Sequence, residues 1–414
     1  MTRALPLVVL VAAVATAIPA QAAEEPAAKS PGWKAGTASA VITPEQPLQM
    51  AGYAARKEPA EGKEQDLFAK SLALEDRDGN RVVIITLDLI GVSEALRTAV
   101  ASQVEEKYKL PPRALLLNAS HTHCGPAYTQ DDAKAYFESL VKTLVDLAGQ
   151  SLDRLQPATL TYSSARCGFA MNRRTPTPKG YTNHPYAEGP VDQVVPVLRV
   201  GDAKGELRTV LFGYACHNTT MGFLKWLGDY AGYAQEYFER DHPGVSAHFL
   251  MGCGGDQNPY PRQKLPYAQQ HGRALATAVE AALQTDQRPV EGAIQTILET
   301  VDLDYTTPDR SPFPYPVQIV QFGKSLCLVA LGSEVVVDYS LRLKRELTRP
   351  GGPIVWVAGY SNVMSGYIPS KRVLEEGGYE AVSRPWNPSL EERIVAKVHE
   401  LFGCLNKSIS QPSE

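Results

Sequence analysis

Cysteine is scarce in this sequence. Six cysteines are spread over 414 residues, namely Cys124, Cys167, Cys216, Cys253, Cys327 and Cys404. Proteins that depend on disulfides for their stability carry cysteine at a much higher density. A disulfide framework is therefore excluded as the basis of this fold, and a hydrophobic core has to stabilise it.

An excess of charge of either sign is also lacking. The chain carries 41 Lys and Arg against 45 Asp and Glu, so its net charge is −4, and its pI is about 6.1. The basic residues are spread along the chain instead of forming runs. Because binding of nucleic acid requires a concentrated basic surface, we expect no nucleic-acid partner.

Long apolar runs are missing beyond the N-terminus. There, Arg3 precedes an apolar stretch over residues 4–18 and the small-residue triplet Ala20-Gln21-Ala22, an arrangement typical of a secretory signal peptide. We therefore predict a signal peptide over 1–22, a flexible leader over 23–32, and export to the periplasm or the medium. A membrane anchor is the alternative, but the stretch is shorter than the ~20 residues that a spanning helix needs.

The sequence does contain enough apolar residues for a large core. Its hydrophobic content is 44%, which in a chain of this length buries a substantial interior. Strand-like and helix-like segments alternate irregularly, and this favours a mixed α/β (α+β) fold with central β-sheets flanked by helices. We predict a single domain over residues 33–405, followed by a tail over 406–414.

The expected elements follow from hydrophobic periodicity and from turn residues. Strands are predicted at 36–42, 81–90, 114–118, 158–163, 194–200, 208–214, 247–251, 293–301, 316–322, 325–331 and 354–359. Helices are predicted at 93–108, 131–152, 231–240, 265–285, 333–347 and 390–401. The segments 176–190 and 306–316 are rich in turn-forming residues and are predicted to be loops.

Polar residues follow three of these strands at the point where each strand ends. His121-Thr122-His123 and His217 each come after a strand, and a glycine-rich segment over 252–259 comes after a third. Loops at sheet edges commonly form binding sites. Each histidine alone could equally be a structural residue. We expect one histidine of the first pair to bind metal and the other to contact either the substrate or a metal ligand.

Two further residues with side-chain oxygens are candidates for chemistry. Glu334 follows the apolar strand 325–331 and is predicted to open a helix, with its carboxylate beside the helix N-terminus. Tyr367 lies in a turn-rich segment after the strand 354–359. An acid at a helix N-terminus is also ordinary helix design, so neither residue identifies a metal site by itself.

Taken in order, these segments resemble the neutral/alkaline non-lysosomal ceramidase family, zinc amidases that cleave N-acylsphingosines. The matching segments are 36–44 with 50–53, 118–126, 172–173, 215–221, 255–259, 332–334 and 359–379. The resemblance implies that His121, His217, Glu334 and Tyr367 bind Zn²⁺. Two imidazoles, a carboxylate and a phenol oxygen make a suitable zinc site with room for water or substrate.

The resemblance also implies a reaction, the hydrolysis of the N-acyl bond of ceramide or a related lipid by metal-activated water. His123, Arg173 and Asp256 are the implied catalytic residues, and Asn258 and Tyr379 the implied substrate contacts. The expected partner is a small-molecule or lipid substrate, which makes peripheral contact with a membrane surface reasonable. Longer family members carry a further C-terminal β-sandwich domain, so we expect this sequence to correspond to the N-terminal catalytic domain only.

Three positions depart from the family pattern and leave alternatives open. Cys124 and Asn258 stand where the family usually has serine, and Tyr260 stands where it has asparagine. A mechanism that needs a serine nucleophile at 258 would fail here. One alternative is a zinc amidase or esterase of the same fold with another acyl substrate, and another is a non-catalytic lipid- or glycan-binding homologue. A third is a cysteine hydrolase that uses Cys124, Cys216 or Cys253 beside a histidine.

Overall fold

The computed structural model describes Met1, residues 32–307 and residues 309–410. The predicted signal peptide 1–22 and leader 23–32 therefore lie outside the described residues, except for Met1 and Gly32. From residue 32 onward the described chain belongs to one compact unit, and the predicted domain 33–405 falls within it. None of the helices in the described ranges combines the length and the hydropathy that a membrane crossing requires.

A large mixed sheet spans much of the unit. Within the described ranges it has nine strands, in the order β12-β10-β9-β6-β1-β3-β4-β5, with β14 paired to β6. The strands are β1 (Trp33–Val41), β3 (Phe68–Asp76), β4 (Arg81–Leu87), β5 (Leu115–Ala119), β6 (Gln156–Arg166), β9 (Val194–Asp202), β10 (Leu207–Tyr214), β12 (Ser246–Met251) and β14 (Arg288–Pro289). Most neighbours are antiparallel, but β5 runs parallel to β4, and β12 runs parallel to β10.

A second sheet packs face to face against the first. It has the order β15-β16-β17-β19, with the strands β15 (Ile294–Leu303), β16 (Phe313–Phe322), β17 (Leu326–Leu331) and β19 (Ile354–Ala358). One buried cluster joins Leu72 and Leu211 of the large sheet to Val320 and Leu328 of the small sheet. Burial of apolar side chains between two sheets is a main source of stability in such an arrangement.

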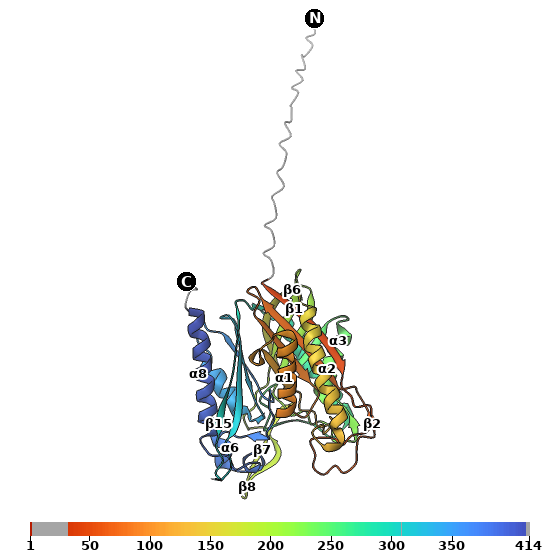
Figure 1. The fold of residues 1–414 in the computed structure, drawn as a ribbon, viewed down its shortest axis with the longest axis vertical. Coiled ribbons are helices and arrows are strands. Elements are labelled where there is room, and N and C mark those ends of the chain that lie inside the picture. Colours follow the sequence, from red (N-terminus) through yellow and green to blue (C-terminus); the bar gives the residue numbers. More distant parts are fainter. Residues whose placement is uncertain (2–31, 308, 411–414) are drawn as a thin grey trace. The chain divides into compact units, whose positions relative to one another are not determined.

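Helices cover the outer faces of both sheets, which gives four layers. Helices α1 (Glu94–Tyr108), α2 (Lys134–Asp153), α3 (Asp229–Asp241) and α4 (Leu265–Leu283) pack on the large sheet, and α5 (Val337–Leu347) and α8 (Leu390–Ser410) pack on the small one. Figure 1 shows α8 beside β15, with α1 and α2 on the far side of the sheets. The short helices α6 (Lys371–Glu376) and α7 (Tyr379–Val382) lie between β19 and α8 in the chain. The predicted fold class is confirmed.

Most predicted elements occur within a few residues of the expected bounds, with informative exceptions. Helix α8 continues to Ser410, into the predicted tail. Strand β3 was not predicted, because its charged residues Lys70, Glu75 and Asp76 hide the apolar pattern of a strand that is buried along almost its whole length. The Lys70 ammonium donates to the Glu239 carboxylate at 2.6 Å and to the Ala247 carbonyl at 2.9 Å. The burial of that charge is thus compensated by partners far away in sequence.

The predicted loop over 176–190 is wrong. Residues Ala170–Thr177 and Gly180–Tyr186 form an antiparallel hairpin, β7 and β8, in a three-stranded sheet with β13 (Gln257–Pro259). Proline and glycine are typical of loops, but β8 is an edge strand, where proline is tolerated because its missing N–H need not enter a ladder. Gly180, with a φ of 105°, allows the tight turn between the two strands.

The strand ends of both sheets meet at one end of the unit. Asn118, at the end of β5, forms a β-bridge with Ser361 beyond β19, and Gly252 beyond β12 forms one with Ala358. The Asn118 side chain donates to the Gly359 carbonyl at 2.7 Å and accepts from the Met251 amide at 2.8 Å. One buried amide therefore ties three strand ends together, and the polar segments that follow them converge.

Candidate metal centre

Two donors of the centre come from segments that directly follow strands. His121 lies two residues after β5 and has a φ of 61°, while His217 lies three residues after β10. A non-glycine residue with positive φ is held in a strained conformation, a feature that clusters at functional sites. Ser333 and Tyr360, with φ values of 66° and 51°, adjoin the same centre.

Glu334 does not open a helix, which corrects the sequence prediction. It lies in the two-residue strand β18 (Glu334–Val335), which runs parallel to β20 (Tyr367–Ile368), and α5 begins only at Val337. In this register Glu334 is paired with Tyr367. The left-handed turn at Ser333 delays the start of the helix. The short ladder then sets the carboxylate and the phenol side by side.

The side-chain donors face one another at close range. The Glu334 Oε2 atom is 3.2 Å from His121 Nε2 and 3.1 Å from His217 Nε2. The Tyr367 Oη atom is 3.3 Å from His217 Nε2. The histidines are almost fully buried. The structure thus brings together the four residues that the resemblance implied as zinc ligands.

Hydrogen bonds to the backbone orient the two imidazoles. The Nδ1 atom of His121 lies 2.6 Å from the Ile90 carbonyl oxygen, and Nδ1 of His217 lies 2.7 Å from the Gly254 carbonyl oxygen. Because a carbonyl can only accept, each Nδ1 carries the proton, and the lone pair of each Nε2 points into the centre. This tautomer is the one that metal-binding histidines with such partners adopt.

The protonation states also suit a metal ion. Burial, together with the charge of Arg173, lowers the pKa of His217 to about 3. Burial alone would raise the pKa of Glu334, but His121 and His217 lower it well below its ordinary value. At neutral pH the imidazole of His217 is therefore neutral and the carboxylate of Glu334 is ionised. Metals require deprotonated donors, and this mixed nitrogen and oxygen set fits zinc.

His123 adjoins the same centre. Its Nε2 is 3.1 Å from Nε2 of His121, and the potential ligand atoms of His121, His123 and His217 all lie within 4.8 Å of one another. Burial is the largest cause that lowers the pKa of His123 well below its ordinary value. A neutral imidazole at this distance could move a proton or act as a further donor.

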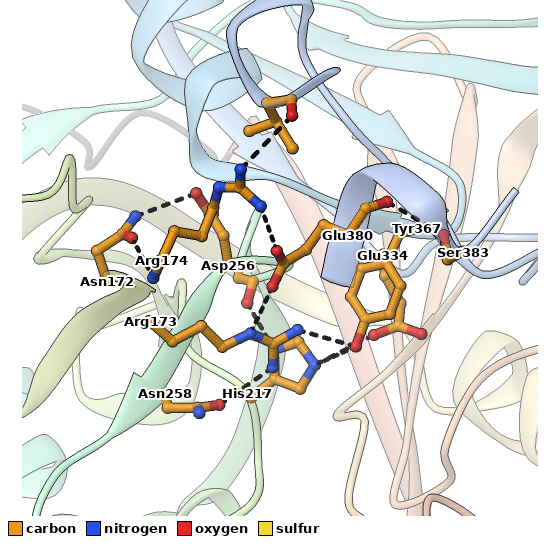
Figure 2. A network of polar contacts seen from close by, with 12 residues as sticks. Asn172, Arg173, Arg174, His217, Asp256, Asn258, Glu334, Tyr367, Glu380 and Ser383 are labelled. Atoms are coloured by element: carbon orange, nitrogen blue, oxygen red, sulfur yellow. Dashed lines mark hydrogen bonds and ion pairs between the residues drawn. The ribbon is translucent and has the colours of Figure 1, made fainter. Parts of the chain in front are cut away.

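A second group of polar residues surrounds Tyr367 (Figure 2). The guanidinium of Arg173, on β7, donates to Tyr367 Oη at 3.0 Å and to Asn258 Oδ1 at 3.2 Å. It also lies over the rings of Tyr367 and Tyr379, 5.4 and 5.6 Å from their centroids. Tyr379 is 56% exposed. These contacts place the predicted substrate residues Asn258 and Tyr379 around Arg173.

Glu380 anchors this group, and the sequence carried no signal for it. Its carboxylate accepts from Arg173 Nε at 2.8 Å and from Arg174 Nη1 at 2.5 Å, and all three side chains are at least 96% buried. Arg174 also donates to the Gly377 carbonyl at 2.7 Å and pairs with Glu376. The arginine pair on β7 thereby docks α6 and α7, which carry Tyr379.

The carboxylate of Asp256 faces away from the histidines. It accepts from the Val337 amide, at the start of α5, at 2.8 Å and from the Asn172 side chain at 3.1 Å. Burial raises its pKa to about 7, against the lowering effect of the Val337 N–H. Its backbone carbonyl accepts from the Arg173 amide at 2.9 Å. This location suits a positioning residue better than the catalytic role predicted from the sequence.

The cysteines near the centre are buried and free of disulfides. Cys124, Cys216 and Cys253 are each fully buried. Burial raises the pKa of the Cys124 thiol to about 12 and raises the pKa of Cys216 and Cys253 strongly. A thiolate nucleophile requires a lowered pKa. The surroundings of these thiols therefore disfavour the cysteine hydrolase alternative.

Comparison with known proteins agrees with this geometry. A family model described as "Neutral/alkaline non-lysosomal ceramidase, N-terminal" matches residues 33–259, more than half of the chain. The chain belongs to this family. The matched range includes His121 and His217 of the metal centre, and Glu334 and Tyr367 lie beyond it.

Individual relatives match to different extents. The neutral ceramidase of Pseudomonas aeruginosa is 24% identical over 91% of this chain, and the match spans 60% of that protein. Neutral ceramidase A of Dictyostelium discoideum is 26% identical over 54% of this chain and 34% of its own length. The crystal structure of the P. aeruginosa enzyme shares the fold, with a TM-score of 0.79 and 20% identity over 93% of this chain and 76% of that one.

Proposed function

We propose that this protein is a zinc-dependent hydrolase that cleaves the N-acyl bond of ceramide or of a related N-acyl lipid. The observation that carries the proposal is the convergence of His121, His217, Glu334 and Tyr367, with the nitrogen lone pairs and the carboxylate directed at one point. Membership of the ceramidase family supports the same reaction. A structural cluster would have no need of four such donors in one buried place.

These four residues would hold the metal ion. When bound there, zinc would supply Lewis-acid polarisation of the amide carbonyl and activation of a water molecule. His123, whose Nε2 faces the centre, would accept a proton from the attacking water and deliver it to the leaving amine. Arg173 would orient the Tyr367 hydroxyl, and Tyr379, exposed beside it, would contact the substrate.

We also propose that the protein is exported and meets its lipid substrate at a membrane surface. The support is the charged, apolar and small-residue pattern over residues 1–22. Expression of the full sequence, purification of the exported protein and sequencing of its N-terminus would test this. A mature start near Ala23 is the expected result, whereas an intact N-terminus on purified protein would contradict export by cleavage.

The decisive experiment measures amine release from N-acylsphingosine and other N-acyl compounds, and fatty-acid release from a panel of O-acyl compounds. Each assay is run before chelation, after chelation, and after zinc is restored. We expect activity to vanish and return with zinc. Cleavage restricted to other acyl compounds would keep the hydrolase and discard ceramide, while activity that survives chelation would contradict a metal mechanism. Metal-loaded protein that binds these lipids without turnover would favour the non-catalytic alternative.

A further inference from the structure

A cavity of about 700 Å³ adjoins the metal centre. Its walls include the apolar side chains of Met221, Phe223 and Leu224. Tyr53 is the wall that the two sites share, because its ring lines the cavity and packs edge-on against His123 with a centroid distance of 4.6 Å. A ligand bound in the metal centre would therefore lie only one side chain, Tyr53, away from a large and mostly apolar cavity.

The cavity is lined by more basic than acidic residues. Arg56, Lys57 and Arg262 line the cavity, and Glu58 is the one acid among its lining residues. The guanidinium of Arg56 is bonded to neutral carbonyls, those of Ala51 at 2.7 Å and Phe223 at 3.0 Å and that of His123. These bonds fix its position, but no carboxylate among the described residues lies within 4.0 Å to pair with its positive charge.

Arg262 is held in a similar way. Its Nη2 donates to Tyr53 Oη at 3.1 Å, while the buried Nε atoms of Arg262 and Arg56 both lack a hydrogen-bond partner within the described ranges. Among the described residues, no carboxylate lies within 4.0 Å of its guanidinium. The nearby Asp229 is occupied by the Met221 and Tyr230 amides, at 2.8 and 2.6 Å.

The arginines on the other side of the metal centre behave differently. Arg173 and Arg174 both pair with Glu380, and Arg372 pairs with Asp338 and Glu376. A half-buried cation without a carboxylate partner is costly unless a ligand supplies the anion. The contrast between the two sides therefore indicates where an anionic group is expected.

We propose that this cavity binds an anionic group on the amine-derived part of an amphiphilic N-acyl substrate, such as the carboxylate of an N-acyl amino acid. The proposal rests on the proposed hydrolase function for the acyl part of that ligand. The fatty-acid carboxylate produced by hydrolysis forms at the metal centre itself, so the cavity recognises a different group. Apolar walls and uncompensated cations together select amphiphiles that carry negative charge.

Binding of two matched probes tests this inference. N-(dodecylsulfonyl)glycine carries a carboxylate where N-(dodecylsulfonyl)ethanolamine carries a hydroxyl, and neither sulfonamide is hydrolysed. Both are titrated calorimetrically into metal-loaded protein, below their critical micelle concentrations. We expect the glycine probe to bind about tenfold more tightly, since hydrogen bonds to charged groups outweigh neutral ones. Added salt should reduce this preference.

Variants assign the preference to the cavity. Arg262→Gln should remove most of it, and Arg262→Lys should retain part of it because the charge is kept. Arg240→Gln, a matched change on the exposed side of α3, serves as the control and should keep the full preference. Lys57→Gln, at an exposed position, should lower the preference by about twofold to threefold, and it provides the test if Arg262→Gln fails to fold.

Equal binding of both probes by the wild-type protein would overturn the proposal. So would a preference that survives in the Arg262→Gln, Lys57→Gln double variant. Because the probes are not cleaved, these outcomes do not depend on turnover. Loss of zinc-dependent hydrolysis would contradict the proposed function, while loss of the carboxylate preference would contradict only the inference about the cavity.

Discussion

The metal centre and the arginine–glutamate group beside it are built from similar polar residues but are balanced differently. In the centre, Glu334 Oε2 lies 3.1–3.2 Å from the Nε2 atoms of His121 and His217, whose ring protons are on Nδ1. In the second group, Glu380 is matched by Arg173 and Arg174. The first arrangement could hold a cation between its donors, whereas the second pairs its own charges. Tyr367 joins them, because its hydroxyl contacts both His217 and Arg173.

The largest difference between the two groups is expected when a metal ligand is removed. We expect His217→Ala to abolish metal retention and to lower turnover about a thousandfold or more, since a catalytic metal supplies several kcal/mol of transition-state stabilisation. Metal content by atomic spectroscopy, steady-state kinetics and circular dichroism would be measured together. His184→Ala, on the exposed edge strand β8, is the control. Full metal content in the His217 variant would refute the assignment.

A change at the junction of the two groups should affect catalysis without removing the metal. Arg173→Lys keeps the charge but loses the fork that reaches Tyr367, Asn258 and Glu380. Misplaced catalytic groups cost about a hundredfold in rate, so we expect kcat to fall by roughly that factor at normal zinc content.

The neighbouring arginine provides the matched control for this change. Arg174→Lys alters the same residue type one position along the strand, where the contacts are with Glu376, Gly377 and Glu380. Its thermal stability should fall while kcat stays within a few-fold of the wild type. Equal loss of kcat in both variants would mean that the two arginines act only through the docking of α6 and α7.

Removal of the Glu380 carboxylate, which Arg173 and Arg174 share, should distinguish an effect on stability and positioning from a direct effect on catalysis. Breaking a buried ion pair costs about 3 kcal/mol or more, so Glu380→Gln is expected to lower the free energy of unfolding by roughly that amount. We expect kcat to fall about tenfold through Arg173, with metal content unchanged. Urea unfolding and kinetics would be compared with those of Glu375→Gln, an exposed neighbour. Loss of zinc in the Glu380 variant would show that the two groups are not separable.

The smallest effect is expected at Cys124, which lies beside the centre but outside both groups. The thiol stays protonated at neutral pH because burial raises its pKa to about 12, and a protonated thiol is a poor nucleophile. Cys124→Ser should therefore change kcat/KM by less than about threefold. Complete inactivation with normal metal content would revive the cysteine mechanism.

Much of the fold was accessible from the sequence because periodicity is local. Strands such as β4, β10 and β17 combine β-branched or apolar residues in short runs, and their positions were predicted within a few residues. The failures came where tertiary partners override local composition. The charges of β3 hid a buried strand, and the prolines and glycines around β7 and β8 hid a hairpin.

The candidate site, like the fold, was predictable from the sequence only in part. Their places after strands made His121, His217 and Glu334 candidates, but only the family resemblance implied that these three residues and Tyr367 form one zinc site. Their meeting point depends on contacts between residues far apart in the chain, such as the Asn118 bridges and the pairing of β18 with β20. Glu380 and the unpaired charge of Arg262 were invisible beforehand. The reason is physical: whether a charge is compensated depends on which distant groups folding brings within a few ångströms of it.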